Sequence, residues 1–247
     1  MFPIRDHNPS GRTPFVTYGL IALNILIFIS YFGIMSDARA LNAFWIDWAM
    51  IPDRIGRGDA LYTLITSMFL HGGLLHLAGN MLFLFIFGDN IEDALGHVGY
   101  LLFYVTCGIL AALAQFAIEP ASGVPTVGAS GAIAGVMGAY LLLFPKARVD
   151  ILIIIVVIIK IMPIPAWIML ALWFGMQFVG GIGSDPNSGG VAYWAHAGGF
   201  VAGLLLAVPV WLARGGTEFW KSTQGQPPHP EARYKLQDSR IPKIKRR

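Results

Sequence analysis

Four polar side chains lie within long apolar stretches of the sequence: His76, Asn80, Ser130 and His196. Polar side chains are costly in hydrocarbon, so each of the four is a candidate for function. A serine hydroxyl becomes a nucleophile when a nearby histidine accepts its proton. Donors such as the side chains of His76 and Asn80 then stabilise an oxyanion on the attacked carbonyl. These residue types therefore suggest acyl transfer, with Ser130 as nucleophile and His196 as base.

Ser130 belongs to the stretch Gly128-Ala129-Ser130-Gly131, which we expect at the start of a helix. Amide N–H groups in the first turn have no intrahelical partner, and the helix dipole favours negative charge there. The alternative is structural, because a serine in a membrane helix often bonds a carbonyl of the preceding turn. The motif alone leaves both interpretations open.

The elements that carry these residues are expected to cross a membrane. The chain is 55% hydrophobic and only 13% charged, with a mean hydropathy of +0.62. Soluble domains carry about 25% charged residues. Because apolar runs of about 20 residues predict membrane spans, we expect an all-α membrane protein with a six-helix bundle. The expected spans are 15–35, 72–93, 98–118, 128–145, 164–182 and 192–213.

Basic residues predict which side of the membrane each connection faces. Most of the 17 Lys and Arg residues fall before the first span, within 146–160 or after the last span. The positive-inside rule therefore places both termini in the cytoplasm. We expect a cytoplasmic N-terminus (1–14), a membrane domain (15–213) and a basic tail (214–247). The tail is expected to be disordered from Gln224 and to contact anionic lipid.

This topology places the serine and the histidine at the same depth. A helix rises about 1.5 Å per residue through a hydrocarbon core about 30 Å thick. Counted from the inner ends of their spans, Ser130 lies about 8 Å and His196 about 6 Å below the outer face. His76 and Asn80 are four residues apart and share one face of their helix. A Ser–His pair with neighbouring donors is therefore geometrically feasible.

Small residues allow the two helices that carry Ser130 and His196 to approach closely. Gly199 and Gly203 form a small-xxx-small step of the kind found at helix contacts in membranes. The Ser130 helix offers Gly131, Gly135 and Gly138. The alternative is that these glycines serve only to pack helices. No acidic third member is obvious near the outer face, so a dyad is the simpler hypothesis.

Two further segments are expected at the membrane surface. The first loop, 35–71, carries Trp45, Trp48 and Tyr62 among apolar residues, and amphipathic aromatics favour the interface. The segment 149–161 is apolar apart from its charged residues. It is either an imperfect seventh span or an interfacial segment. We favour the interface, because charges bracket the segment tightly and two prolines follow it.

Over residues 15–213, three motifs resemble, by their order and spacing, those of the rhomboid intramembrane serine proteases. In chain order they are His71-Gly-Gly-Leu-Leu-His76-Leu-Ala-Gly-Asn80, Gly128-Ala-Ser130-Gly131, and Ala195-His196 with its following glycines. The resemblance implies a six-helix fold, a Ser130–His196 dyad and an oxyanion site formed by His76, Asn80 and the Ser130 amide. It also implies water access from the outer side, no metal and no cofactor.

The resemblance further implies substrates with a single membrane span whose helices unwind near small residues. The lack of an appended domain favours a bacterial inner membrane. The stretch Gly88–Gly96 resembles a family segment in which Glu92 hydrogen-bonds a neighbouring loop; an exposed interfacial acid is the alternative. Two positions depart from the family. Residues 60–63 lack its Trp-Arg pair, and Ala134 replaces a tyrosine that stacks on the histidine in some members.

Three other function classes were weighed against a protease. A rhomboid-like binding protein without activity typically lacks the nucleophile or the base, and both are present here. A transporter or channel also places polar residues within the membrane, but often shows internal repeats that this chain lacks. Nucleic-acid binding is not supported, because topology already explains the basic residues. We therefore expect a serine endopeptidase whose partners are transmembrane-helix proteins and membrane lipid.

Overall fold

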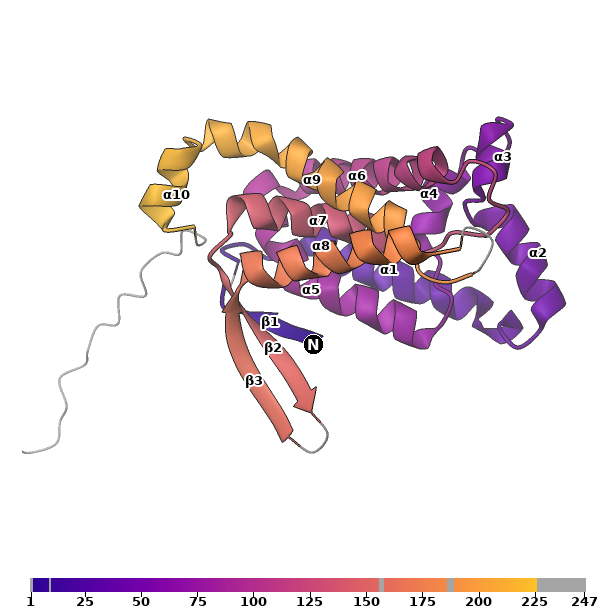
Figure 1. Ribbon diagram of the computed structural model, residues 1–247, viewed down its shortest axis with the longest axis horizontal. Helices are drawn as coiled ribbons and strands as arrows, with labels where there is room; N and C mark the ends of the chain where they lie inside the picture. The colour runs from indigo at the N-terminus through magenta and orange to yellow at the C-terminus, as the bar shows by residue number, and fades with distance from the viewer. Residues whose placement is uncertain (1, 9, 156–157, 186–188, 226–247) are drawn as a thin grey trace, which may run out of the picture.

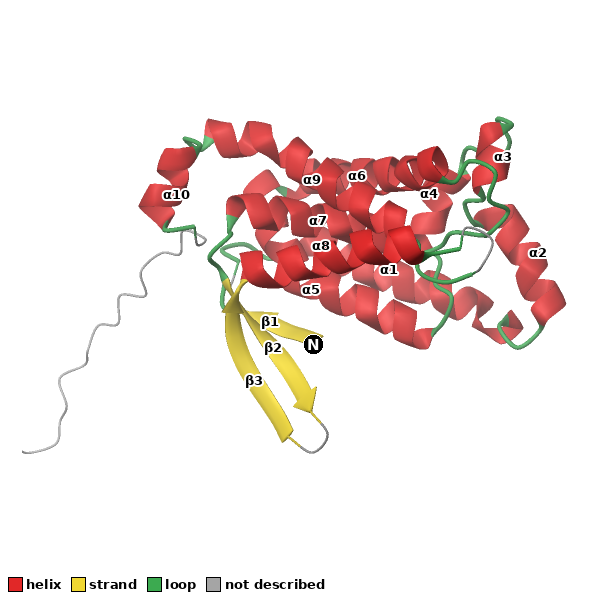
Figure 2. Ribbon diagram, viewed as in Figure 1, coloured by secondary structure: helices red, strands yellow, loops and turns green. Residues whose placement is uncertain are grey.

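The computed structural model describes residues 2–8, 10–155, 158–185 and 189–225 as a helical bundle with a small sheet at one end (Figures 1 and 2). In this part of the chain, five helices are long and apolar enough to cross a membrane. They are α1 (Phe15–Tyr31, extended by η1, Phe32–Ile34), α5 (Leu74–Leu95), α6 (His97–Ile118), α8 (Ala166–Gly183) and α9 (Tyr193–Ala213). The predicted helical membrane bundle is thus confirmed.

The fourth expected span, 128–145, is shorter in the structure than the others. Helix α7 (Ser130–Leu143) has 14 residues and packs against α5, α6 and α9. Residues 131–140 are all buried, which is the pattern of a helix that is apolar on every side. At about 1.5 Å per residue the helix covers roughly 21 Å, less than the hydrocarbon core. The helix that begins at the candidate nucleophile is therefore held mainly by protein rather than by lipid.

The first loop folds into short helices at the end of the bundle opposite the sheet (Figure 1). They are α2 (Ala38–Trp48), α3 (Pro52–Gly56), α4 (Thr63–Thr66) and η2 (Ser67–Phe69). Asp37 caps α2, and a bridge between Met50 and Thr126 joins this loop to the segment before α7. Trp48 and Tyr62 are 45% and 52% exposed. Contact of this loop with the membrane surface stays a prediction.

Three antiparallel strands were not expected from the sequence. They are β1 (Phe2–Asp6), β2 (Arg148–Ile155) and β3 (Ile158–Pro165), in the order β1-β2-β3. The segment 149–161 therefore forms most of a hairpin instead of a spanning helix, and its run of β-branched residues favours strands. Its interfacial position stays a prediction. Helix α10 (Thr217–Thr223) follows the bundle within the expected basic tail. Disorder was predicted from Gln224 on, and all of that part after residue 225 lies outside the described residues.

Polar contacts attach the sheet to the end of the bundle that lies opposite the first loop. Tyr140, near the end of α7, donates a hydrogen bond to Asp6 Oδ2 at 2.8 Å. Burial raises the pKa of the Asp6 carboxyl to about 7, and the nearby Asp89 carboxylate adds to the effect. On β2, hydrogen bonds from His7 and Arg5 at 2.7 and 2.6 Å hold the pKa of Asp150 below its usual value.

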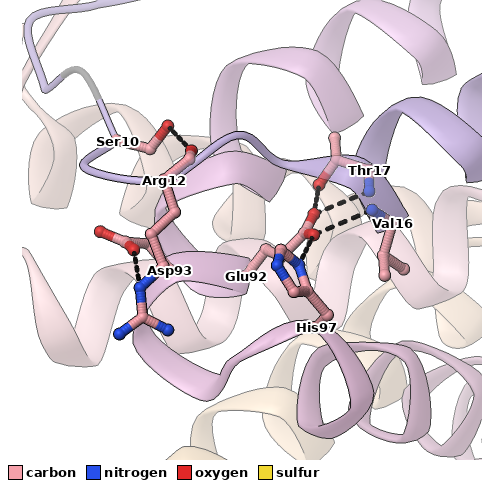
Figure 3. Close-up of polar contacts among 7 residues, drawn as sticks. All are labelled: Ser10, Arg12, Val16, Thr17, Glu92, Asp93 and His97. Atoms are coloured by element: carbon pink, nitrogen blue, oxygen red, sulfur yellow. Dashed lines mark hydrogen bonds and ion pairs between the residues drawn. The ribbon is translucent and has the colours of Figure 1, made fainter.

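Glu92 occupies the last turns of α5 at this end and is 2% exposed. Figure 3 shows its polar contacts. Its carboxylate accepts hydrogen bonds from the backbone N–H groups of Val16 and Thr17 at 2.8 and 2.7 Å, and from Thr17 Oγ1 at 2.7 Å. His97 Nδ1 lies 2.6 Å from Glu92 Oε1, the oxygen that also accepts from the Val16 N–H. The N-cap of α1 is Pro14, which supplies no side-chain cap, so Glu92 caps α1 from another helix. The exposed-acid alternative is therefore wrong.

Candidate active site

Ser130 is the first residue of α7, and the turn before it requires glycine. Gly128 has φ +134°, a conformation that side chains rarely adopt, and its N–H donates to Ser67 O at 2.9 Å. A Cβ at this position would lie 2.9 Å from His76 Nε2 and 3.3 Å from Ser130 Oγ. The absence of a side chain at Gly128 thus allows the His76 ring to lie close to the serine hydroxyl.

His196 lies in the first turn of α9, with Nε2 2.7 Å from Ser130 Oγ. Main-chain contact between α7 and α9 makes this approach possible. A methyl group at Gly199 would overlap the carbonyl oxygen of Gly131, and one at Gly203 would overlap that of Gly135. The small residues noted in the sequence therefore do pack the two helices, and that packing brings the serine and the histidine within hydrogen-bond distance.

The other ring nitrogen of His196 meets an amide from α8. Gln177 Oε1 lies 2.8 Å from His196 Nδ1, and Gln177 Nε2 donates to the carbonyl of Trp173 at 3.3 Å. The Trp173 ring lies over the imidazole, with ring centroids 5.7 Å apart and an interplanar angle of 31°. Ala134 offers no ring to stack on His196, and Trp173 supplies one from a different helix.

His76 and Asn80 lie on α5 and face the same cavity as Ser130 and His196. The N–H of Gly72 donates to His76 Nδ1 at 3.3 Å, which leaves the proton of a neutral ring on Nε2. Asn80 is buried, and its amide nitrogen has no hydrogen-bond partner within the described residues. Both side chains therefore hold an N–H donor that has no partner among the described residues.

The cavity measures ≈ 990 Å³. Its lining includes Ser130, His196, His76 and Asn80, the four polar residues that stood out in the sequence. It is large enough for a peptide segment, since small-molecule pockets measure about 300–1,000 Å³. Among the described residues, no group of three or more His, Cys, Asp or Glu side chains is placed to hold a metal ion.

Sequence reasoning missed three residues around this site, Gln177, Trp173 and Gln115. Gln115 Oε1 accepts a hydrogen bond from the Ala195 N–H at 3.1 Å and so satisfies the start of α9 from α6. Both glutamines lie in apolar runs, and both are less than 9% exposed. The reasoning that selected Ser130 and His196 also applies to them, so a signal was present.

Comparisons with known proteins identify relatives of this chain. A family model described as the Rhomboid domain matches residues 58–213. Rhomboid protease GluP of Bacillus subtilis (strain 168) is 33% identical over 211 residues, which cover 82% of this chain and 36% of that protein. The putative rhomboid protease YdcA of the same organism is 41% identical over 80 residues, which cover 32% of this chain and 40% of that protein.

A relative from a eukaryotic organelle is also similar. RHOMBOID-like protein 6, mitochondrial, of Arabidopsis thaliana is 39% identical over 100 residues, which cover 39% of this chain and 29% of that protein. The matches span well under half the length of each of these three relatives. The family model nevertheless covers more than half of this chain and includes all four cavity residues. With its five helices long enough to cross a bilayer, the chain is an integral membrane protein that belongs to the rhomboid family.

Proposed function

We propose that this chain is a serine endopeptidase that cleaves membrane-spanning proteins, with Ser130 as nucleophile and His196 as general base. The main support is the 2.7 Å distance between Ser130 Oγ and His196 Nε2, in a cavity that His76 and Asn80 also line. The names of similar proteins, Rhomboid protease GluP among them, support the same activity. The pair contains no carboxylate, since His196 Nδ1 faces the amide of Gln177.

The proposed reaction has two halves. Ser130 Oγ attacks the scissile carbonyl carbon while its proton passes to His196 Nε2. The tetrahedral intermediate then expels the amine, which takes that proton from His196, and an acyl-enzyme remains. Water attacks the acyl-enzyme in the second half, with His196 accepting and returning a proton in the same way. The products are a carboxylic acid and an amine, and the enzyme is restored.

The oxyanion of each intermediate would be stabilised by three donors. They are the backbone N–H of Ser130, Nε2–H of His76 and the amide nitrogen of Asn80. The last is buried without a partner, so a substrate oxygen would not have to displace an existing hydrogen bond. The start of α7 adds the positive end of a helix dipole. This arrangement uses no metal ion and no cofactor.

The remaining expectations belong to the same proposal. Residues 15–213 form the proteolytic unit with six spans, both termini face the cytoplasm, and cleavage takes place near the outer face. The substrates are proteins with a single span, and lipid surrounds the bundle. The orientation of the termini rests on the distribution of Lys and Arg. The bacterial inner membrane is the proposed location, in line with the similar proteins from Bacillus subtilis; relatives from mitochondria show that the family also occurs elsewhere.

The test uses purified protein in liposomes with a panel of single-span proteins and identifies cleavage products by mass spectrometry. We expect wild type to cleave at least one substrate and Ser130→Ala to lose cleavage entirely, because no other group replaces the nucleophile. Ser30→Ala is the matched control, since Ser30 on α1 hydrogen-bonds only a carbonyl of its own helix, Ile27 O, at 2.6 Å. It should cleave like wild type.

Labelling with a fluorophosphonate separates the proposal from its alternatives. A reactive serine should be labelled at Ser130, and the label should be lost in His196→Ala. Cleavage that persists in Ser130→Ala would overturn the proposal. Tight binding of membrane helices without cleavage or labelling would instead favour an inactive binding protein, and solute flux that depends on Asn80 would favour a transporter.

A further inference from the structure

Gln177 is a buried polar residue on α8, the outermost of the helices near the site. Its side chain is 8% exposed. Neither the family motifs nor the serine–histidine chemistry requires it. Yet Gln177 Oε1 lies 2.8 Å from His196 Nδ1, a distance typical of a well-formed hydrogen bond. An amide at this depth is costly unless both of its ends are used.

The two ends of the amide determine where the proton of His196 lies. Gln177 Nε2 lies 3.3 Å from the backbone oxygen of Trp173, and a carbonyl oxygen only accepts hydrogen bonds. The amide must therefore direct its NH₂ group to Trp173 and its oxygen to His196. Since an amide oxygen is also only an acceptor, Nδ1 of the neutral ring must carry the proton. Nε2 is then unprotonated, as a base facing the Ser130 hydroxyl must be.

We infer that Gln177 is a positioning residue, which holds His196 in the tautomer and orientation that activate Ser130. The inference rests on the proposed function. In serine proteases with a triad, a buried carboxylate fulfils this task. Here a neutral amide fulfils it, from a helix that carries neither member of the pair. The Trp173 ring, one turn before Gln177 on the same helix, restricts the tilt of the His196 imidazole.

The position of α8 on α9 therefore becomes part of the site. Two glycines fix that position one turn after Gln177. A Cβ at Gly180 would lie 2.5 Å from the Tyr193 ring, and one at Gly181 would lie 2.9 Å from the Trp194 ring. Gly175, on another side of α8, has nothing within 4 Å. The contact face of α8 thus places the amide on His196, while the rest of the helix has no part in it.

Two variants of Gln177 separate a positioning role from a packing role. Gln177→Met keeps the length of the side chain but removes the acceptor, so kcat should fall about 10- to 100-fold, as for other residues that orient a functional group. KM should change less than about twofold, because substrate contacts are intact. Gln177→Glu keeps an oxygen acceptor and should recover most of the lost rate. The exposed neighbour Met176→Ala is the control and should match wild type.

Fluorophosphonate labelling should slow by the same factor as cleavage in Gln177→Met, since both depend on the reactivity of Ser130. Wild-type cleavage and labelling in Gln177→Met would overturn the inference, and so would equal losses in the Met and Glu variants. Failure of the proposed function looks different, because wild type and Ser130→Ala would then behave alike.

A measurement that needs no substrate turnover tests the inference even if the proposed function fails. The ¹⁵N shifts of the His196 ring, assigned by their loss in His196→Gln, distinguish the two neutral tautomers. We expect the Nδ1–H form in wild type and in Ser130→Ala, and a mixture or the Nε2–H form in Gln177→Met. The same tautomer in all three proteins would overturn the role of Gln177.

Discussion

Two buried polar side chains toward opposite ends of helix α5, Glu92 and Asn80, differ in how their hydrogen bonds are satisfied. At the Glu92 end, one carboxylate meets four hydrogen-bond partners, and three of them come from the first turn of α1 (Figure 3). At the Ser130 end, the buried amide nitrogen of Asn80 has no partner within the described residues. Both residues lie on α5, about 12 residues apart in the sequence.

The difference shows which end of α5 maintains the fold and which end serves chemistry. A saturated buried carboxylate stabilises the protein, because losing it would leave several donors without partners. An unsatisfied buried donor does the opposite and lowers stability by about 1–3 kcal/mol. It is retained where a group that arrives later, such as an oxyanion, can use it. One helix therefore carries a structural polar residue and a candidate catalytic one, each identifiable by its hydrogen bonds.

Among the variants that test this contrast, the largest expected effect is on rate and comes from Asn80. Asn80→Ala should lower kcat about 10²- to 10³-fold, as loss of one oxyanion donor does elsewhere. Its thermal midpoint should stay the same or rise, because a buried donor without a partner is removed. The assay is single-turnover cleavage beside thermal unfolding in detergent.

Asn24→Ala is the matched control for that prediction. Asn24 is also a buried asparagine on a membrane helix, away from the cavity. Its amide nitrogen donates to Leu20 O at 2.8 Å, and only its amide oxygen lacks a partner within the described residues. It should change stability and leave kcat alone. A large loss of stability in Asn80→Ala would break the contrast between the two ends.

The next effect is on stability and comes from Glu92. Glu92→Gln should lower the free energy of unfolding by about 3 kcal/mol, because the amide must turn an NH₂ group toward donors that need an acceptor. The turnover of the folded fraction should not change. Unfolding titrations in mixed micelles measure the first quantity, and active-site titration with a fluorophosphonate corrects the second.

Asp93→Asn tests whether removing the charge of the residue next to Glu92 lowers the free energy of unfolding as much. Asp93 pairs with Arg12 at 3.5 Å, and the Arg12 side chain is 68% exposed, so the loss should be below about 1 kcal/mol. If Glu92→Gln reduced kcat of the folded enzyme as strongly as Asn80→Ala, the division between the ends would be wrong.

The smallest effect is a pH dependence at the Glu92 end. Burial raises the pKa of Asp6 from 3.8 to about 7, so between these values the folded state holds a proton that the unfolded state has released. Stability from this group is therefore lost as the pH rises from about 4 to 7. Asp6→Asn should flatten that slope, by about 1–2 kcal/mol for a partly buried group.

Unfolding of wild type and Asp6→Asn at pH 5 and pH 8 measures the slope. The exposed Asp53, paired with Arg57, gives the control Asp53→Asn, which should keep the wild-type slope. A steeper slope in Asp6→Asn would contradict the assignment. An unchanged catalytic rate per folded molecule would sharpen the contrast with the Ser130 end.

The sequence was sufficient to predict the candidate pair, because its signal is local and costly. The serine and the histidine each lie in a separate apolar helix, close to spaced glycines. Counting residues along each helix then predicts a similar depth in the membrane for both. The helical bundle followed from hydropathy in the same way. Hydropathy did not predict the length of α7, because a helix buried by neighbouring helices is as apolar as one surrounded by lipid.

The residues around His196 could not be placed from the sequence. Gln177 and Trp173 contact the ring only because α8 lies against α9 with a particular rotation, and that rotation depends on the glycine contacts at Gly180 and Gly181. The hairpin of β2 and β3 was missed for another reason. A short run of Ile and Val fits a strand and a membrane segment equally well, and its pairing with β1 comes from far away in the chain.

The glycine contact between α7 and α9 limits which substitutions this protein can accept during evolution. Where side chains set a distance, a substitution is absorbed by a new rotamer. Between Gly131 and Gly199, and between Gly135 and Gly203, main chain meets main chain, so there is no torsion to adjust. Forming this contact costs no side-chain entropy, since glycine has none to lose. The separation of Ser130 and His196 should therefore tolerate extensive drift of the lipid-facing residues, yet a single added methyl group at the crossing would disrupt it.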